Sequence, residues 1–158
     1  MNQPSPTTDI RRDLVALLPR LRRFALTLAG NGGEADELVR EATARAIQKS
    51  HHWRGEGRIE NWLFSLIRTT WTDELKKRRR NDREAALQPD PDSRRASGPV
   101  LSLPEGLASA ILLTDIEGFT YTEAAAILGI TTELLSTRLC AARLSLVAAG
   151  SETSERRA

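Results

Sequence analysis

Apolar residues recur every three or four positions along most of this chain, which is the spacing of one face of an α-helix. The first such segment runs from about residue 9 to residue 28, and Pro19 is expected either to kink it or to divide it. The next helix is predicted from Glu34 to about Lys49, with acidic residues at its start and a cation at its end, as the helix dipole favours. The N-terminal region is therefore expected to be helical.

A third segment, Trp53 to Arg80, opens with a loop that holds Gly55 and Gly57 and then continues without Gly or Pro as one long helix. One side of this helix is apolar. The other carries hydroxyls, an amide and cations: Asn61, Ser65, Arg68, Thr69, Thr72, Lys76 and Arg79. We expect the apolar side to be buried and the polar side to be exposed.

The same helix ends in consecutive cations, Lys76 to Arg80, here called the basic run. These charges repel one another unless an anion lies alongside, and a nucleic-acid backbone favours such a cluster through the release of counterions. A solvated, frayed helix end accounts for an isolated basic run about as well. The run alone leaves both interpretations open.

A helix-turn-helix is predicted near the C-terminus. Thr120 and Glu123 have the spacing of a capping box at the head of a short helix that ends at Leu128. Gly129 turns the chain, and Thr131 or Thr132 caps a last helix that reaches about Val147. A short helix, a glycine turn and a longer helix are typical of this motif.

Between the two helical regions lies a stretch rich in Pro, Ser, Asp and Arg without lasting periodicity, which predicts a linker. The predicted fold is all-α: two small helical domains joined by a flexible linker, the second domain being a helix-turn-helix. The expected boundaries are a disordered tail over 1–8, a first domain over 9–82, the linker over 83–102, a second domain over 103–148 and a tail over 149–158.

Composition supports this fold class. Apolar residues make up 40% of the 158 residues but aromatic residues only 4%, so the core must consist mainly of Leu and Ala, which favour helices. Cys140 is the only cysteine, which excludes an intrachain disulfide and a cysteine-based zinc site. The N-terminus lacks the apolar run of a signal peptide, and no segment approaches the about 18 apolar residues of a transmembrane helix. We expect a cytoplasmic protein without membrane insertion.

Several chemically suggestive residues have a simpler interpretation. His51 and His52 are adjacent and have no third ligand nearby in sequence, so an exposed helix end is expected rather than a metal site. Trp71 is expected in the core, although stacking on a base is the alternative. Cys140 is expected to pack rather than to act as a redox switch. No nucleophile–base spacing and no Gly-rich phosphate cradle occur, so we expect no enzyme, catalytic residue, metal or cofactor.

Longer motifs add a family resemblance. In the first domain they are Glu34-Ala35-Asp36-Glu37-Leu38-Val39-Arg40-Glu41, Trp53-Arg54-Gly55-Glu56, Asn61-Trp62-Leu63-Phe64-Ser65-Leu66-Ile67-Arg68 and Asp73-Glu74-Leu75. In the second they are Leu103-Pro104, Ile111-Leu112-Leu113-Thr114-Asp115-Ile116-Glu117-Gly118-Phe119-Thr120-Tyr121, Glu123-Ala124-Ala125, Ile127-Leu128-Gly129-Ile130 and Ser136-Thr137-Arg138-Leu139. With these motifs in this order, the chain resembles the extracytoplasmic-function (ECF) type of bacterial RNA polymerase sigma factor from about residue 10 to residue 147.

The resemblance implies a promoter-specificity subunit of RNA polymerase core that helps to open the DNA duplex. The first domain would bind the clamp coiled coil of the β′ subunit, and the β flap would be a further polymerase contact. The polymerase-binding residues would be Asp36, Glu37, Arg40 and Glu41. Family habit also implies an anti-sigma partner wedged between the two domains.

The resemblance likewise implies two promoter contacts. The melted minus-ten strand needs a pocket for an extruded base and cations for its backbone, and would contact Arg54, Arg58, Asn61, Ser65, Arg68, Thr69, Thr72, Lys76, Arg79 and Arg80. The last helix would enter the major groove of the minus-thirty-five element. The residues on that helix would be Thr132, Glu133, Ser136, Thr137, Arg138 and Arg143.

Three positions depart from the family pattern. Arg40 stands where glutamine is usual, and Thr69 replaces a frequent asparagine. The recognition helix retains only Arg138 and Arg143 as cations, against Glu133 near its start. Either the upstream element is read weakly or this half has partly turned to protein binding. A sigma-like decoy that sequesters an anti-sigma protein is therefore the alternative function. A helix-turn-helix repressor is a third, but it leaves the first domain without a task.

Overall fold

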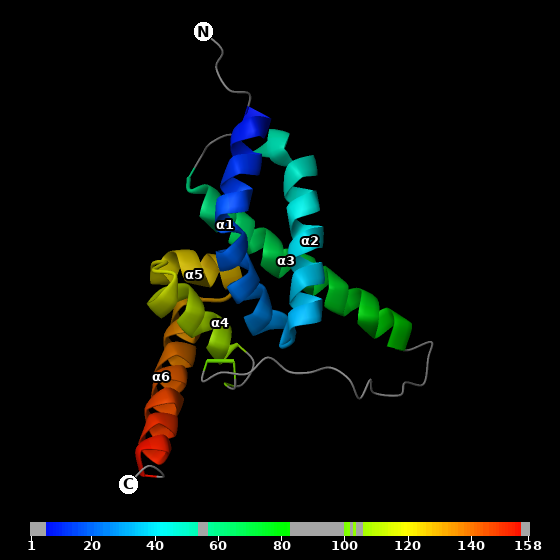
Figure 1. Cartoon of the computed structure of the whole chain (residues 1–158). Helices are drawn as coiled ribbons and strands as arrows, with labels where there is room; N and C mark the ends of the chain where they lie inside the picture. Colours follow the sequence, from blue (N-terminus) through cyan, green and yellow to red (C-terminus); the bar gives the residue numbers. More distant parts are fainter. Residues whose placement is uncertain (1–5, 54–56, 83–99, 102, 104–105, 156–158) are drawn as a thin grey trace.

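The computed structural model describes residues 6–53, 57–82, 100–101, 103 and 106–155, and all the regular elements in these ranges are helices (Figure 1). This confirms the all-α prediction. The helical elements, in chain order, are α1 (Pro6–Ala29), α2 (Gly32–Gln48), a 3₁₀ turn (Ser50–His52), α3 (Ile59–Asp82), α4 (Leu107–Ile111), a π-helical turn η2 (Leu112–Ile116), α5 (Tyr121–Leu128) and α6 (Thr132–Glu155). The predicted linker lies outside the described residues, apart from Val100 and Leu101.

Helices α1, α2 and α3 form the N-terminal unit (Figure 1). Pro19 lies inside α1 and does not divide it. Because Pro19 itself is exposed while Leu17 and Leu21 on either side are buried, packing holds the helix together across the missing backbone hydrogen bond. Helix α1 already begins at Pro6, so the prediction of a disordered tail is wrong for residues 6–8.

The C-terminal unit contains α4, η2, α5 and α6. The Thr120 hydroxyl accepts a hydrogen bond from the Glu123 amide at 3.2 Å, as the capping-box spacing predicted. Gly129 follows α5 with φ at +65°, a left-handed conformation that favours glycine. The Thr131 hydroxyl accepts from the Leu134 amide at 3.1 Å, which identifies Thr131 as the cap of α6. Helices α5 and α6 meet at 99°, an angle within the range of a helix-turn-helix.

Helix α6 is longer than the sequence pattern indicated. It continues to Glu155, so residues 149–155 of the predicted tail are helical. Past Leu146 the helix projects away from the other elements (Figure 1), and Leu144 and Val147 are 66% and 69% exposed. The apolar spacing fades there because this part of α6 has little core to face.

One hydrophobic cluster runs through both units. At its centre Phe24 of α1 stacks on Phe64 of α3, with ring centroids 5.4 Å apart. Phe64 in turn meets the edge of Phe119, which lies between η2 and α5, at 5.0 Å. These are all the phenylalanines of the chain. The two units therefore share a core instead of being connected by the linker alone, while the domain boundaries given above stay a prediction.

Within the described residues no single helix is both long enough and apolar enough to cross a membrane. One bent pair of helices, Tyr121–Leu128 with Thr132–Ser151, has the length and apolar composition of a membrane span when the two helices are taken together. The first helix of that pair is the capped helix α5, whose Ala124, Ala125, Ile127 and Leu128 are buried in the shared core.

Replacing Phe64 by alanine tests the shared core. Because Phe64 is fully buried and contacts rings from both units, the Phe64→Ala variant is expected to lose about 3–5 kcal/mol of unfolding free energy. Urea denaturation followed by circular dichroism measures this. Val15→Ala, at a position 68% exposed on α1, is the matched control and should change the value by about 0.5 kcal/mol or less. Equal effects of the two variants would contradict this description of the core.

Candidate nucleic-acid and polymerase interfaces

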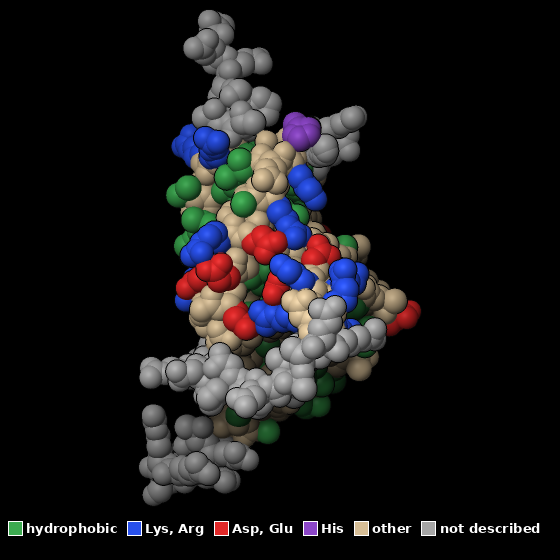
Figure 2. All heavy atoms as spheres, turned by 90° about the vertical axis from the view of Figure 1, so that its right-hand side faces the viewer, with side chains coloured by type: hydrophobic (Ala, Val, Ile, Leu, Met, Phe, Trp, Pro, Cys, Tyr) green, Lys and Arg blue, Asp and Glu red, His purple; other side chains and the backbone are tan. Residues whose placement is uncertain are grey.

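The predicted polymerase-binding residues lie together on the exposed side of α2. Each is already paired: Asp36 accepts from Arg22 at 2.7 Å, Glu37 from Arg40 at 2.5 Å, and Glu41 from Arg45 at 2.8 Å. Figure 2 shows acidic and basic side chains intermingled across the middle of this face. The structure thus brings Asp36, Glu37, Arg40 and Glu41 onto one surface of mixed charge.

Two arginines tie α2 to α3. Arg45 bonds Asp73 at 2.9 Å besides Glu41, and the hydrogen bond to Asp73 is the main reason that the pKa of Arg45 is raised. Arg78 bonds both Glu34 and Glu74 at 3.0 Å and lies 5.4 Å over the Trp71 ring. Burial alone would lower the pKa of Arg78, but the two carboxylates raise it. Arg78 is therefore a structural member of the basic run.

A groove of about 310 Å³ lies between these helices, lined by Gly33, Glu34, Glu37, Leu38, Glu41, Trp71, Glu74 and Arg78. Its glutamates make it predominantly acidic, so it suits a basic partner better than DNA. Among the described residues no group of three or more His, Cys, Asp or Glu side chains is arranged to hold a metal ion.

The polar side of α3 is not the free surface that its pattern predicted. Asn61, Ser65, Arg68 and Thr72 are half-buried, because α5 packs against α3. The expectation that this side is exposed is therefore wrong for these four residues. Thr69 is exposed, but its hydroxyl donates to the Leu66 carbonyl of its own helix at 3.1 Å.

The arginines of this side face the C-terminal unit. The Arg68 guanidinium lies so close to Gly129 that a β-carbon there would overlap it. Arg58 bonds Glu60 at 3.0 Å, lies 5.8 Å over the Phe119 ring and approaches Glu123 of α5 at 3.8 Å. Arg54 lies outside the described residues.

The C-terminal end of α3 stays open. Lys76, Lys77, Arg79 and Arg80 are exposed, and none of them forms an ion pair with an acidic side chain that the structure describes, a set that does not include Asp82. Four like charges on adjacent turns of one helix repel one another. The chain thus presents an uncompensated cationic helix end of the kind that the phosphates of a nucleic acid neutralise.

On α6 the candidate minus-thirty-five residues divide into two groups. Thr132, Glu133, Ser136 and Thr137 are exposed on one side of the helix, and the hydroxyls of Ser136 and Thr137 donate to carbonyls of their own helix at 3.0 and 3.1 Å. The two cations of this helix, Arg138 and Arg143, are engaged in other contacts.

Arg143 forms a two-pronged contact with Asp115 of η2, at 3.0 and 2.7 Å, and donates to the Tyr121 hydroxyl at 3.4 Å. The hydrogen bond from Arg143 lowers the pKa of Asp115, against the opposing effect of burial. Arg138 is half-buried with its guanidinium against Gly106. It lines a groove of about 400 Å³ between the units, together with Leu28, Arg68, Trp71, Thr72, Leu75, Gly106, Ser109 and Leu128.

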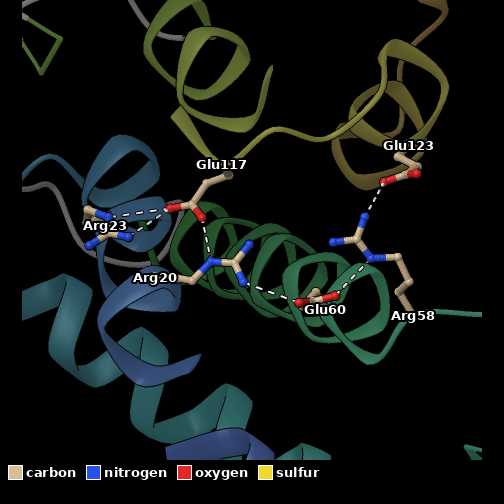
Figure 3. Close-up of polar contacts among 6 residues, drawn as sticks. All are labelled: Arg20, Arg23, Arg58, Glu60, Glu117 and Glu123. Carbon is tan, nitrogen blue, oxygen red and sulfur yellow. Dashed lines mark hydrogen bonds and ion pairs between the residues drawn. The ribbon is translucent and has the colours of Figure 1, made fainter. Parts of the chain in front are cut away.

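Sequence reasoning missed a charge cluster across the two units (Figure 3). Glu117 belongs to the C-terminal unit, but its side chain, only 3% exposed, points at α1. It accepts from Arg20 at 2.6 Å and from Arg23 at 3.2 Å. Arg20 also bonds Glu60 at 3.3 Å. The sole sequence signal of this cluster is the motif Glu117-Gly118-Phe119, which by itself predicts no role for the carboxylate.

Comparison with known proteins gives two family-model matches: Sigma-70 region 2 over residues 14–81 and Sigma-70, region 4 over residues 100–146. The chain is 31% identical to the ECF RNA polymerase sigma factor EcfG of Rhodopseudomonas palustris, covering 90% of this chain and 86% of that protein. It is 29% identical to the ECF RNA polymerase sigma factor SigE of Mycolicibacterium smegmatis, covering 80% of this chain and 56% of that protein.

Similar solved structures include those of RpoE and CnrH. The sigma factor RpoE, solved with the anti-sigma factor NepR from Bartonella quintana, matches with a TM-score of 0.73 and 25% identity, over 87% of this chain and 94% of that one. CnrH, solved with the cytosolic domain of CnrY, matches with a TM-score of 0.61 and 21% identity over 93% of each chain. The second match concerns the fold alone.

The contact between Asp115 and Arg143 predicts a pH dependence. Because the pKa of Asp115 is lowered in the folded chain, the pair contributes stability above the ordinary aspartate pKa of about 3.9 and loses it as the pH falls through the lower folded value. At pH 7 the urea midpoint of Asp115→Asn should lie below that of the unmodified chain, and the difference should vanish well below pH 3.9. Asp13→Asn, on α1 and without an ion pair among the described residues, is the control. A midpoint difference that persists in strong acid would rule out this origin.

Proposed function

We propose, from the premise that this chain belongs to the ECF RNA polymerase sigma factors, that it directs RNA polymerase core to promoters and assists the melting of the minus-ten element. The observation that supports this proposal most strongly is the uncompensated cationic end of α3, formed by Lys76, Lys77, Arg79 and Arg80. Single-stranded DNA requires such a cationic track for its backbone. The family acts in transcription and not in catalysis, in keeping with the site chemistry described above.

The remaining promoter contacts follow from the same premise. Arg54, Arg58, Asn61, Ser65, Arg68, Thr69 and Thr72 would contact the melted strand from the loop and the first turns of α3. Thr132, Glu133, Ser136, Thr137, Arg138 and Arg143 would face the minus-thirty-five element from α6. The Oδ1 atom of Asn61 is buried without a hydrogen-bond partner in the described structure. This unsatisfied acceptor supports a role for Asn61 in binding DNA.

For protein partners we propose RNA polymerase core and an anti-sigma protein. The mixed-charge surface of α2, with Asp36, Glu37, Arg40 and Glu41, would dock on the β′ clamp coiled coil. The β flap would be a further contact. The similar sigma factor RpoE was solved with the anti-sigma factor NepR, and this supports an anti-sigma partner for the present chain.

A sigma-like decoy is the second candidate function. It would bind an anti-sigma protein and no promoter. The observation in its favour is α6, where Arg138 and Arg143 are both engaged within the described structure while Leu144 and Val147 are exposed. A run-off transcription assay with purified core and genomic fragments separates the two functions, because a decoy yields no promoter-dependent transcript.

The cationic end of α3 gives the decisive substitution. A variant with Lys76, Lys77, Arg79 and Arg80 changed to glutamine should lower promoter-dependent run-off transcription about tenfold or more while core binding is retained. The slope of log DNA affinity of the holoenzyme against log salt should become shallower by about 3 if all four cations contact phosphates. Arg78 is kept, because it holds α2 and α3 together.

Arg11→Gln with Arg12→Gln is the matched control. Both arginines are exposed on α1 and make no ion pair among the described residues. Transcription by this control should stay within about twofold of the unmodified chain at physiological salt, because exposed charges far from the DNA are screened. Unchanged transcription by the four-cation variant would refute the proposed role of α3.

A further inference from the structure

We propose that the described arrangement is a closed state, in which a charge latch between the two units withholds the minus-ten surface until the units separate. The latch is the set Arg20, Arg23, Arg58, Glu60, Glu117 and Glu123 (Figure 3). Its consequence for DNA rests on the proposed function, whereas its existence rests only on the contacts between the units.

The strongest part of the latch is the Glu117 carboxylate. It is nearly inaccessible to solvent, and Arg20 and Arg23 of α1 hold both of its oxygens. Burial alone would lower the pKa of Arg20, but the bonds to Glu117 and Glu60 raise it. A buried carboxylate is stable only when it is paired, and the partners of Glu117 come from the other unit. Glu117 therefore fits the closed arrangement and would return to water when the units part.

A second row of contacts extends the latch along α3. Glu60 bonds Arg20 on one side and Arg58 on the other, and Arg58 reaches towards Glu123 of α5. The guanidinium of Arg20 lies 5.7 Å over Phe64 and that of Arg58 lies 5.8 Å over Phe119. The charged row thus covers the edge of the phenylalanine stack and keeps water from it.

The closed arrangement occupies residues that the proposed function needs. Arg58 is engaged in the latch, and Arg68 is pressed against the turn at Gly129. Arg68 and Arg138, which would serve two different promoter elements, line one groove between the units. A DNA strand could engage Arg68 and Arg138 fully only after the units part, and Arg58, although 55% exposed, would first have to leave Glu60.

Two polar atoms at the junction suit the closed state poorly. The Oδ1 atom of Asn61 and the Oε2 atom of Glu123 are buried without a hydrogen-bond partner among the described residues. Such an atom destabilises the arrangement that buries it. The closed state therefore combines a strong charge latch with an unsatisfied acceptor on the surface that would hold DNA, as a reversible contact requires.

The test measures the distance between the units in the full chain. Spin labels are placed on the native Cys140 of α6 and on Ala44→Cys of α2, both exposed positions, and distances are read by pulsed electron resonance. The parent should give one narrow distribution. Glu117→Gln should broaden it, and Glu117→Lys should shift it to longer distances. Circular dichroism must show unchanged helix content, which is expected because Glu117 contacts the other unit instead of its own core.

The matched control is Asp73→Asn. It removes the same charge and breaks an ion pair of 2.9 Å with Arg45, but both partners lie in the N-terminal unit. Its distance distribution should equal that of the parent. An unchanged distribution in Glu117→Lys, or equal broadening in the control, would overturn the latch.

Fluorescence anisotropy with a single-stranded minus-ten oligonucleotide then tests the masking. Glu117→Gln should bind about tenfold more tightly than the parent, because the competent state is no longer a minor population. Asp73→Asn lies nearer the basic run, so an effect of net charge alone would be at least as large there. Equal gains in both variants would overturn the masking. If the distances open while no variant binds DNA, the latch is supported and the proposed promoter function fails.

Discussion

The contact of Phe24, Phe64 and Phe119 is the constraint on which the rest of the arrangement depends. The chain has few aromatic residues, and most of its core is made of leucine and alanine. Rings packed at 5.0 and 5.4 Å add about 0.5–1.5 kcal/mol per pair beyond the area that they bury. Because Phe64 touches a ring on either side, the orientation of α3 is fixed by both units at once.

Charge placement around these rings makes the junction reversible. Glu117 and its arginines lose hydration when the units meet, and the mutual attraction of buried ions offsets that cost only in part. When the units separate, all these groups return to water together, so no ion is left unpaired in an apolar environment. Removing one partner has a different result, since it leaves the other charges buried and uncompensated. Removal of one latch residue therefore favours the separated units, in which the remaining charges are hydrated.

Local sequence patterns predicted the helices well because helix formation is decided by nearby residues. Thr120, Gly129 and the spacing of buried leucines each act within a few positions. The same reasoning is wrong for Asn61, Ser65, Arg68 and Thr72, since a polar helix side by itself predicts exposure to water. In the folded chain this side faces another unit whose surface is also polar at its rim.

Ion pairs between the two units have no comparable signature in the local sequence. Glu117 meets Arg20 and Arg23 across 97 and 94 positions of sequence, and no periodicity links residues so far apart. The engagement of Arg143 by Asp115 was equally hidden, across 28 positions. For that reason the candidate DNA residues could be listed from the sequence, whereas their division into free and engaged cations required the structure.

Under the proposed function, that division implies an order of events at a promoter. The cationic end of α3 lies outside the junction, so it can meet phosphates while the units are still closed. Such contacts are independent of sequence and are weakened by salt. Residues that would contact bases, such as Asn61 and Arg68, become reachable only after the junction opens. The charged surface of α2 pairs only with side chains of the N-terminal unit, Arg22 of α1 among them, so opening would leave it unchanged and polymerase could dock in either state. DNA binding would thus depend on the opening of the interface between the units, whereas polymerase docking would not.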